Sequence, residues 1–471
     1  MSEARDLAII GAGPAGMAAA ITAATLGVDT VVLDEQASPG GQIYRAITET
    51  PVRHGTVFGD DYWRGLDLAR AFIGSGATYL PGTTVFSVAP RVEDDRREIG
   101  ISSGGQARLL RARHVIVATG AQERPMPVPG WTLPGVLTAG AAQILLKSAG
   151  LAPSGRTVLA GSGPLLWLLA AQLLRAGGTL SAILDTTPRI RPGLDMLAFA
   201  TSPYLSKGLA LMRETRRHLA PISGLTGLRA EGDDRLRGVS FFDRAGTTRR
   251  IDCDTLLLHQ GVVPNVNLAM SIGCAHRWDD SQLCFVPTLD AWGHSGTDGV
   301  SIAGDGAGIA GAESAAERGR LAALDAACRL GRIDAARRDR EAEAPRRVLA
   351  TYGRGRAFLE RAFRPIEAHR IPSGDTIACR CEEVSAAQIE DAVRIGATGP
   401  NQLKAYLRCG MGPCQGRLCG LTVTELIARA RGKTPDEIGH YRLRPPVKPI
   451  TVAELASLPR SEAETNAVAR Q

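Results

Sequence analysis

The chain has 471 residues, enough for two or three domains, and its hydrophobic (44%) and charged (22%) shares are ordinary for a globular protein. Aromatic residues make up only 4%, which argues against recognition of nucleic acid by base stacking, so we expect no nucleic-acid partner. The formal net charge of +7 comes from scattered Lys and Arg. It is compatible with anionic cofactors and equally with a solvated basic surface.

The beginning of the chain enters a strand directly, without a basic and apolar leader. The most apolar stretch, residues 158–174, is interrupted by Gly161, Gly163 and Pro164, whereas a membrane span needs about 20 continuous apolar residues. We therefore expect a cytoplasmic location, and docking at the periphery of the inner membrane stays open.

A first βαβ unit opens the chain. Residues 6–10 predict a buried strand, residues 11–16 form a G-x-G-x-x-G motif, and an Ala-rich helix runs to about Leu26. In such a motif the first glycine permits a tight turn, and the second lets the backbone approach a pyrophosphate. The third lets the helix pack closely on the strand, and the helix N-terminus faces the phosphates. The unit predicts a site for a dinucleotide or another ADP-containing ligand.

The second strand of this unit, residues 30–33, ends in two acids. Asp34 follows Gly16 by 18 residues, close to the spacing of an acid that binds a ribose. Asp34 is preferred because it is the first residue past the apolar run, and Glu35 stays an alternative.

A second unit of the same kind begins at Thr157 and includes the turn Gly161-Ser-Gly163. Leu166 occupies the position where close helix packing favours glycine or alanine, so binding of NAD(P)H and a purely structural role both stay open. Two such units predict two nested domains, the first interrupted by the second. The expected parts are 1–145 and 251–370 for the first domain and 146–250 for the second.

Three further motifs narrow the class: Gly40-Gly41-Gln42, residues 117–120 (Val-Ala-Thr-Gly), and Gly304-Asp305 after an apolar strand. In this order they resemble the FAD fingerprints of the glutathione-reductase-like flavoproteins over about residues 5–330. The resemblance implies that Asp305 binds the ribityl chain of a flavin and that Thr119 and Gly120 lie against the adenosine half. The implied cofactor-binding residues are Gly11, Gly13, Pro14, Ala15, Gly16, Asp34, Glu35, Gly41, Gln42, Arg45, Thr119, Gly120, Gly304 and Asp305.

Disulfide reductases of this superfamily carry a redox cysteine pair beside the flavin. No C-x-x-C or C-x4-C pair follows Gly41 in the first domain, and none occurs in the second. Four cysteines are isolated and are expected to be core thiols: Cys253, Cys274, Cys284 and Cys328. Disulfide reductase chemistry is therefore disfavoured.

Five cysteines gather between residues 379 and 419, which indicates a metal site in a reducing compartment. The segment, expected as a domain over 371–435 with a C-terminal arm over 436–471, resembles the small helical [2Fe–2S] module of bacterioferritin-associated ferredoxin. That family uses C-x-C followed by C-x-x-C, whereas the last pair here is C-x4-C. The preferred ligands are Cys379, Cys381, Cys414 and Cys419. Replacement of one of the last two by Cys409, a zinc site and an empty module stay open.

Longer strings, among them residues 40–45, 120–125, 129–143, 409–417 and 444–450, resemble the A (alpha) subunits of two-component opine oxidases. Alpha subunits of dye-linked proline dehydrogenase and of sarcosine oxidase, and one of the hydrogen cyanide synthase subunits, are similar. The resemblance implies an α/β fold of two nested Rossmann-like domains, as in glutathione-reductase-like flavoproteins, plus the helical [2Fe–2S] module.

The resemblance also implies a catalytic beta flavoprotein subunit that oxidises a C–N bond of an amino-acid-derived secondary amine. Electrons would pass through FAD in this chain, with FMN at a subunit interface left open, to the cluster and on to a quinone or other acceptor. No catalytic residue is assigned to this chain, and His259 is expected to be a packed strand residue. A self-sufficient NAD(P)H-dependent reductase and a non-redox nucleotide-binding scaffold are the alternatives.

Overall fold

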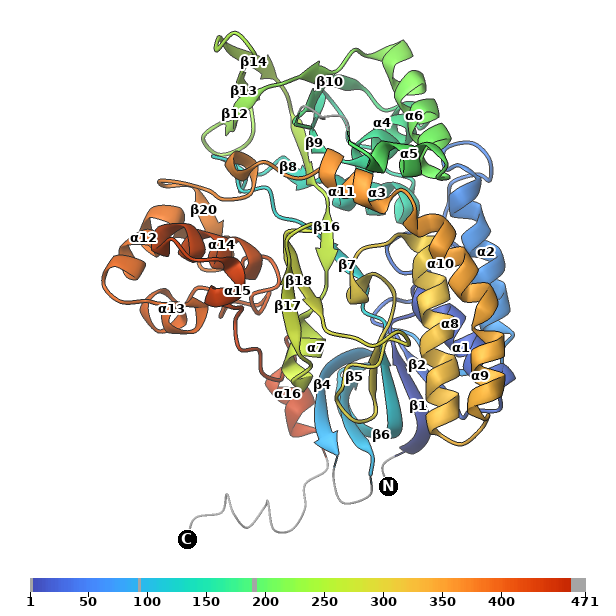
Figure 1. Cartoon of the computed structure of the whole chain (residues 1–471). Helices are drawn as coiled ribbons and strands as arrows, with labels where there is room; N and C mark the ends of the chain where they lie inside the picture. Colours follow the sequence, from blue (N-terminus) through green and yellow to red (C-terminus); the bar gives the residue numbers. More distant parts are fainter. Residues whose placement is uncertain (1–2, 92–94, 189–192, 459–471) are drawn as a thin grey trace.

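The computed structural model describes residues 3–91, 95–188 and 193–458. Two sheets with helices stand one above the other, and a small helical module lies beside the junction between them (Figure 1). The first sheet has the order β3-β2-β1-β6-β5-β4, with β19 added beside β6. Its strands are β1 (Glu3–Ile10), β2 (Thr30–Leu33), β3 (Thr78–Leu80), β4 (Thr84–Arg91), β5 (Arg97–Ser103), β6 (Gln106–Val117) and β19 (Val300–Ile302).

The parallel part of the first sheet positions the glycine loops. β1 pairs in parallel with β2 and β6, and β19 pairs in parallel with the last residues of β6. Parallel strands present their carboxyl ends at one edge of a sheet, where ligands bind in folds of this kind. The loops that begin at Gly11, Ala118 and Ala303 therefore emerge side by side, although they are far apart in the sequence.

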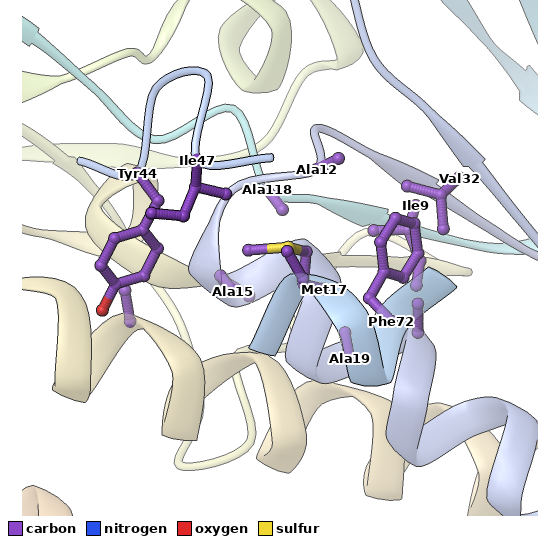
Figure 2. Close-up of a cluster of buried hydrophobic side chains, with 14 of the residues drawn as sticks. Ile9, Ala12, Ala15, Met17, Ala19, Val32, Tyr44, Ile47, Phe72 and Ala118 are labelled. Atoms are coloured by element: carbon purple, nitrogen blue, oxygen red, sulfur yellow. The ribbon is translucent and has the colours of Figure 1, made fainter. Parts of the chain in front are cut away.

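The N-terminal helix α1 (Pro14–Thr25) is almost wholly buried, which explains its alanine-rich sequence. Figure 2 shows Met17 among Ile9 and Val32 of the sheet and Phe72 of α2 (Asp60–Ile73). On its other side α1 meets α8 (Ala312–Arg329) so closely that a Cβ atom on Gly319 would lie 2.0 Å from a carbonyl oxygen of α1. Small residues thus allow two helices to cover one face of the sheet.

The second sheet has the order β11-β10-β9-β15-β8 and is also parallel. Its strands are β8 (Val136–Thr138), β9 (Thr157–Ser162), β10 (Leu180–Asp185), β11 (Ile222–Ser223) and β15 (Thr255–Gln260). The residues between β11 and β15 form a separate antiparallel sheet of β12 (Thr226–Glu231), β13 (Gly238–Phe242) and β14 (Thr248–Asp252). The helices of this part are α3 (Ala139–Ala149), α4 (Pro164–Arg175), α5 (Asp195–Ala200) and α6 (Tyr204–His218).

The chain crosses between the two sheets twice, at two short strands that pair with each other. β7 (Ala121–Glu123) and β16 (Val262–Pro264) are antiparallel, with Gln122 opposite Val263. The second domain was expected over residues 146–250. Because β8 and β15 already belong to the second sheet, the chain crosses before residue 145 and returns after residue 250. Beside the crossings lie α7 (Asn267–Ile272), β17 (His276–Asp279) and β18 (Cys284–Pro287).

Helices continue from the first domain towards the cysteine-rich segment. They are η1 (Gly304–Ala307), α9 (Ala335–Glu341), α10 (Glu343–Gly353), α11 (Arg356–Ala362) and η2 (Glu367–His369). No helix within the described ranges is both long enough and apolar enough to cross a bilayer.

The C-terminal module packs around a core of its own, which includes Ile389, Leu403 and Leu426. Its elements are β20 (Ile377–Cys379), β21 (Val384–Ser385), α12 (Ala386–Arg394), α13 (Pro400–Leu407), α14 (Gly420–Arg431) and α15 (Pro435–Ile438). A capping box opens α12, because the Gln388 N–H donates to Ser385 Oγ and the Ser385 N–H donates to Gln388 Oε1. Helix α14 begins at Gly420, directly after the cysteine loop.

The arm that follows the module returns to the first sheet, where α16 (Val452–Ala456) lies near β4 and β6 (Figure 1). The Val447 N–H donates to the Phe86 carbonyl oxygen at 2.9 Å, and Lys448 forms an ion pair with Glu35 at 2.6 Å. The arm therefore connects the module to the first nucleotide-binding unit.

Candidate functional site

The first glycine loop turns where β1 meets the end of β6. Gly11 has φ +108°, and a Cβ atom there would lie 2.5 Å from the Ala118 carbonyl oxygen. Glycine is required on both grounds, conformation and space. The loop delivers the backbone N–H groups of the α1 N-terminus to the sheet edge, as binding of a phosphate group requires.

The two acids after β2 have different environments. Asp34 is buried, and its carboxylate accepts hydrogen bonds from the N–H groups of Ala12 at 2.5 Å and Gln36 at 2.7 Å. Burial raises the pKa of Asp34 despite these bonds. Glu35 is exposed and pairs with Lys448. Asp34 therefore links the glycine loop to the strand end and stays the preferred ribose ligand.

A second loop, residues 40–45, lies directly over the first. A Cβ atom on Gly41 would lie 2.9 Å from the Gly13 Cα atom, and the Gly40 N–H donates to the Ala12 carbonyl oxygen at 2.8 Å. Arg45 is the last residue of this loop, and its buried Nε atom has no hydrogen-bond partner within the described ranges. An unpartnered guanidinium N–H beside a helix N-terminus fits the negative charge of a diphosphate.

Lys147 of α3 supports this loop from below, which the sequence did not reveal. Its Nζ atom donates to the carbonyl oxygens of Gln42 (3.2 Å) and Ile43 (2.9 Å) and to Gln143 Oε1 (3.0 Å). Burial, with a smaller effect of nearby Arg45, lowers the pKa of Lys147 to about 7. This buried amine has no carboxylate partner among the described residues, and it adds positive charge to the floor of the site only below about pH 7.

The third part of the site comes from the ends of β6 and β19. Asp305 Oδ1 accepts hydrogen bonds from the N–H groups of Ala310 (2.8 Å) and Gly311 (3.0 Å). These bonds orient the carboxylate, and Oδ2 can accept a hydrogen bond from a ligand hydroxyl. Thr119 and Gly120 are anchored to Asn265, which receives the Thr119 Oγ1 hydrogen bond and donates its N–H to the Gly120 carbonyl oxygen.

The structure thus brings together the three predicted segments. The 40–45 loop contacts Gly13, and a Cβ atom on Gly304 would lie 2.7 Å from the Ala15 Cβ atom. The glycine loop, Arg45 and the oriented Asp305 carboxylate offer the kinds of hydrogen-bonding groups and charge that suit a flavin dinucleotide.

The second glycine loop keeps the form of a nucleotide-binding turn. Gly161 has φ +147°, and a Cβ atom there would lie 1.8 Å from the His259 carbonyl oxygen. Leu166 is fully buried in the core. A cavity of about 450 Å³ lies beside the carboxyl end of β10, lined by Trp167, Asp185 and other residues.

His259 is more than a packed strand residue. Its Nδ1 atom lies 2.6 Å from Glu123 Oε1, and Glu123 Oε2 accepts the Gly140 N–H at 2.8 Å. The buried pair connects β15 to β7 across the crossing between the sheets. The two residues are 136 positions apart, so no local pattern could have indicated this pair.

The five clustered cysteines form one connected group of thiols, and its compact part contains Cys409 with only two of the four preferred ligands, Cys379 and Cys419. The sulfur atoms of Cys379, Cys409 and Cys419 all lie within 4.8 Å of one another and are buried. Cys381 and Cys414 are half-buried and hydrogen-bonded to each other, and Cys414 also interacts with Cys419. All nine cysteines of the chain are free thiols.

The electrostatics of this site favour the thiolate at Cys379 and Cys414 only. Burial raises the pKa of Cys381, and hydrogen bonds to neighbouring sulfur atoms raise the pKa of Cys409 and Cys419. Hydrogen bonds from Cys409 and then Cys419 lower the pKa of Cys379 to about 2, and a hydrogen bond from Cys419 is the main cause that lowers the pKa of Cys414 to about 5. Sulfur ligands lie about 2.3 Å from a metal such as zinc, so sulfurs within 4.8 Å of one another can share one metal centre. The donor set fits a soft metal site and does not by itself separate iron from zinc.

Residues 5–329 match the family described as pyridine nucleotide-disulphide oxidoreductase. The chain belongs to this family. Residues 376–458, which include the cysteine module and the arm, match the sarcosine oxidase A3 domain. The fold is accordingly the mixed α/β FAD/NAD(P)-binding fold of these oxidoreductases, and the chain is an FAD-dependent oxidoreductase.

Full-length relatives agree with this assignment. The chain is 47% identical to the A component of the opine oxidase of Rhizobium meliloti, over 99% of this chain and 90% of the relative. It is 32% identical to the HcnB component of the hydrogen cyanide synthase of Pseudomonas aeruginosa, over 96% of this chain and 98% of that relative. The structure of L-proline dehydrogenase from P. horikoshii has the same fold, with a TM-score of 0.69 at 18% identity, over 97% of this chain and 80% of that chain.

Proposed function

We propose that this chain is the electron-transfer subunit of a two-component dehydrogenase that acts on amino-acid-derived amines of the opine or proline type. A catalytic beta flavoprotein subunit would oxidise the C–N bond of a secondary amine. This chain would hold FAD in the first nucleotide site and a [2Fe–2S] cluster in the C-terminal module, and would pass electrons to a quinone or other acceptor. The observation that carries the proposal is the convergence of five thiols at a flavoprotein fold.

The combination of the two sites has a chemical reason. A flavin accepts two electrons as a hydride, whereas a [2Fe–2S] cluster carries one electron at a time, so a flavin beside a cluster converts one kind of transfer into the other. Several relatives are named as subunits, of opine oxidase and of sarcosine oxidase, which supports a partner chain. We expect this complex in the cytoplasm, with FMN at the subunit interface as a further cofactor to test.

For the cluster we propose the ligands Cys379, Cys381, Cys414 and Cys419, with Cys409 as a fifth thiol that donates a hydrogen bond to the Cys379 sulfur. This set keeps the C-x-C pair at the end of β20 and just after it, and the C-x4-C pair before α14. Hydrogen bonds to ligand sulfurs tune the potential of such clusters, which gives the fifth thiol a function. For FAD we propose the residues of the three converging segments, with Asp34 on the ribose and Asp305 on the ribityl chain.

The decisive experiment is cofactor analysis of the anaerobically purified chain, alone and co-expressed with the partner. Flavin, iron, acid-labile sulfide and zinc are measured per chain, and EPR spectra are recorded after reduction. We expect flavin with about two irons and two sulfides per chain and a rhombic signal. Zinc without sulfide, or no flavin even in the complex, would overturn the redox proposal and favour a scaffold.

A second candidate, a self-sufficient NAD(P)H-dependent reductase, is favoured by the retained second glycine loop and the cavity beside Asp185. The Asp185 carboxylate accepts hydrogen bonds from the Thr187 N–H at 3.0 Å and its hydroxyl at 2.5 Å. Bleaching of the flavin absorbance by NADH in the isolated chain distinguishes this candidate from the first, because in the first the flavin is reduced only when the partner is present.

A further inference from the structure

The cysteine module is held against the flavoprotein domain by its own cysteine loop. Gln122 Nε2 donates a hydrogen bond to the Arg417 carbonyl oxygen at 2.5 Å, and Asn267 Nδ2 donates one to the Gln415 carbonyl oxygen at 3.1 Å. Both acceptors lie between Cys414 and Cys419. The docking contacts therefore act on the loop that carries half of the proposed cluster ligands.

Both donors stand on segments anchored at the flavin site. Gln122 lies in β7, two residues after Gly120, and Asn267 begins α7, two residues after Asn265. Asn265 itself is hydrogen-bonded to Thr119 and Gly120. The connection from Gly120 to the cysteine loop thus consists of two residues of strand and one hydrogen bond.

An apolar contact adds to these hydrogen bonds. Leu421, at the start of α14, packs against Val263, Cys284 and Val286, and Val263 is the strand partner of Gln122. Asn267 is 4% exposed, and both hydrogen bonds are partly buried. Partly buried hydrogen bonds are stronger than fully exposed ones.

We infer that Gln122 and Asn267 are positioning residues that hold the 414–419 loop against the flavoprotein domain, at a fixed place relative to the Thr119–Gly120 segment. The inference rests on the proposed function. Each transfer moves one electron from the two-electron-reduced flavin to the oxidised cluster, the flavin protons go to water, and an acceptor of the quinone class reoxidises the cluster. Neither residue binds a cofactor, so each acts only through the position of the loop.

The test compares Gln122→Met, which keeps the shape but removes the donor, with Asn267→Ala and with the exposed control Gln402→Met, all in the full chain co-expressed with its partner. Loss of one hydrogen bond, about 1 kcal/mol, corresponds to an increase of about fivefold in undocked loop. We expect amide hydrogen exchange of residues 414–419 to rise by about this factor in both docking variants. Rapid-mixing measurement should show slower cluster reduction, while substrate reduces the flavin as in wild type.

Cofactor content keeps the two proposals separate. Wild-type exchange and wild-type electron transfer in both docking variants, with flavin, iron and sulfide at wild-type levels, would overturn the positioning role and leave the proposed function intact. A wild-type chain without iron or flavin would overturn the proposed function itself. Faster exchange and slower transfer in both variants, with the control unchanged, would establish the positioning role of Gln122 and Asn267.

Discussion

Replacing Lys147 with methionine tests whether an amine with a lowered pKa is buried under the first nucleotide site. Lys147 is 2% exposed, faces Arg45 and the Tyr62 ring, and has only neutral acceptors among the residues that the structure describes. Burial lowers its pKa from 10.5 to about 7. The unfolded chain regains the ordinary pKa and therefore binds more protons than the folded chain between pH 7 and 10.5. In this range the buried amine makes the free energy of unfolding rise with pH.

The expected size of the effect follows from the shift. One pKa unit corresponds to about 1.36 kcal/mol, so between pH 7.5 and 9.5 wild type should gain about 2 to 3 kcal/mol relative to Lys147→Met. Urea unfolding at the two pH values measures this difference, and comparison with the variant cancels the titration of all other groups. Lys433→Met, at an exposed lysine of the module, serves as the control. An equal stability difference between wild type and Lys147→Met at both pH values would refute the lowered pKa of the buried amine.

Three further predictions concern the two sites. Gly11→Ala should lower the thermal midpoint and the FAD content much more than Gly27→Ala does. Both residues have positive φ, so alanine costs about 1–3 kcal/mol of backbone strain at either position, but only at Gly11 would the new Cβ atom also clash with a carbonyl oxygen. Arg45→Gln should weaken FAD binding about tenfold or more in fluorescence titration, because a charge-assisted hydrogen bond contributes about 1.5–3 kcal/mol; unchanged affinity would exclude Arg45 from the site. Cys379→Ser should lose iron and sulfide, whereas Cys409→Ser should retain both with an altered EPR spectrum; loss in both would make Cys409 a ligand.

The class of enzyme could be predicted from the sequence because its signals are local. Gly11 and Gly161 are required by backbone geometry and close contacts within single turns, and such requirements leave a readable pattern. The capping box at Ser385 is equally local, since both of its hydrogen bonds join residues three positions apart. The family assignment and the FAD-dependent oxidoreductase class confirm what these patterns predicted.

Other features depended on contacts between distant segments. The sequence left Cys409 outside the preferred ligand set, and folding places its sulfur close to those of Cys379 and Cys419. His259 was likewise expected only as a packed strand residue, and the tertiary structure shows that it also pairs with Glu123. In both cases the partner is decided by how strands and loops pack, which residue spacing along the chain does not encode.

The sequence by itself therefore determined the two glycine units, the cysteine module and the oxidoreductase class, because each arises from residues close together in the chain. Only the tertiary structure decided where the buried amine of Lys147 lies and how Gln122 meets Arg417, a contact across 295 positions. Parallel strands draw the ends of distant segments to one sheet edge, and the crossing strands β7 and β16 present a surface for the module. The physical reason is that burial and hydrogen bonding select partners in space, whereas motifs report only on their own turn of chain.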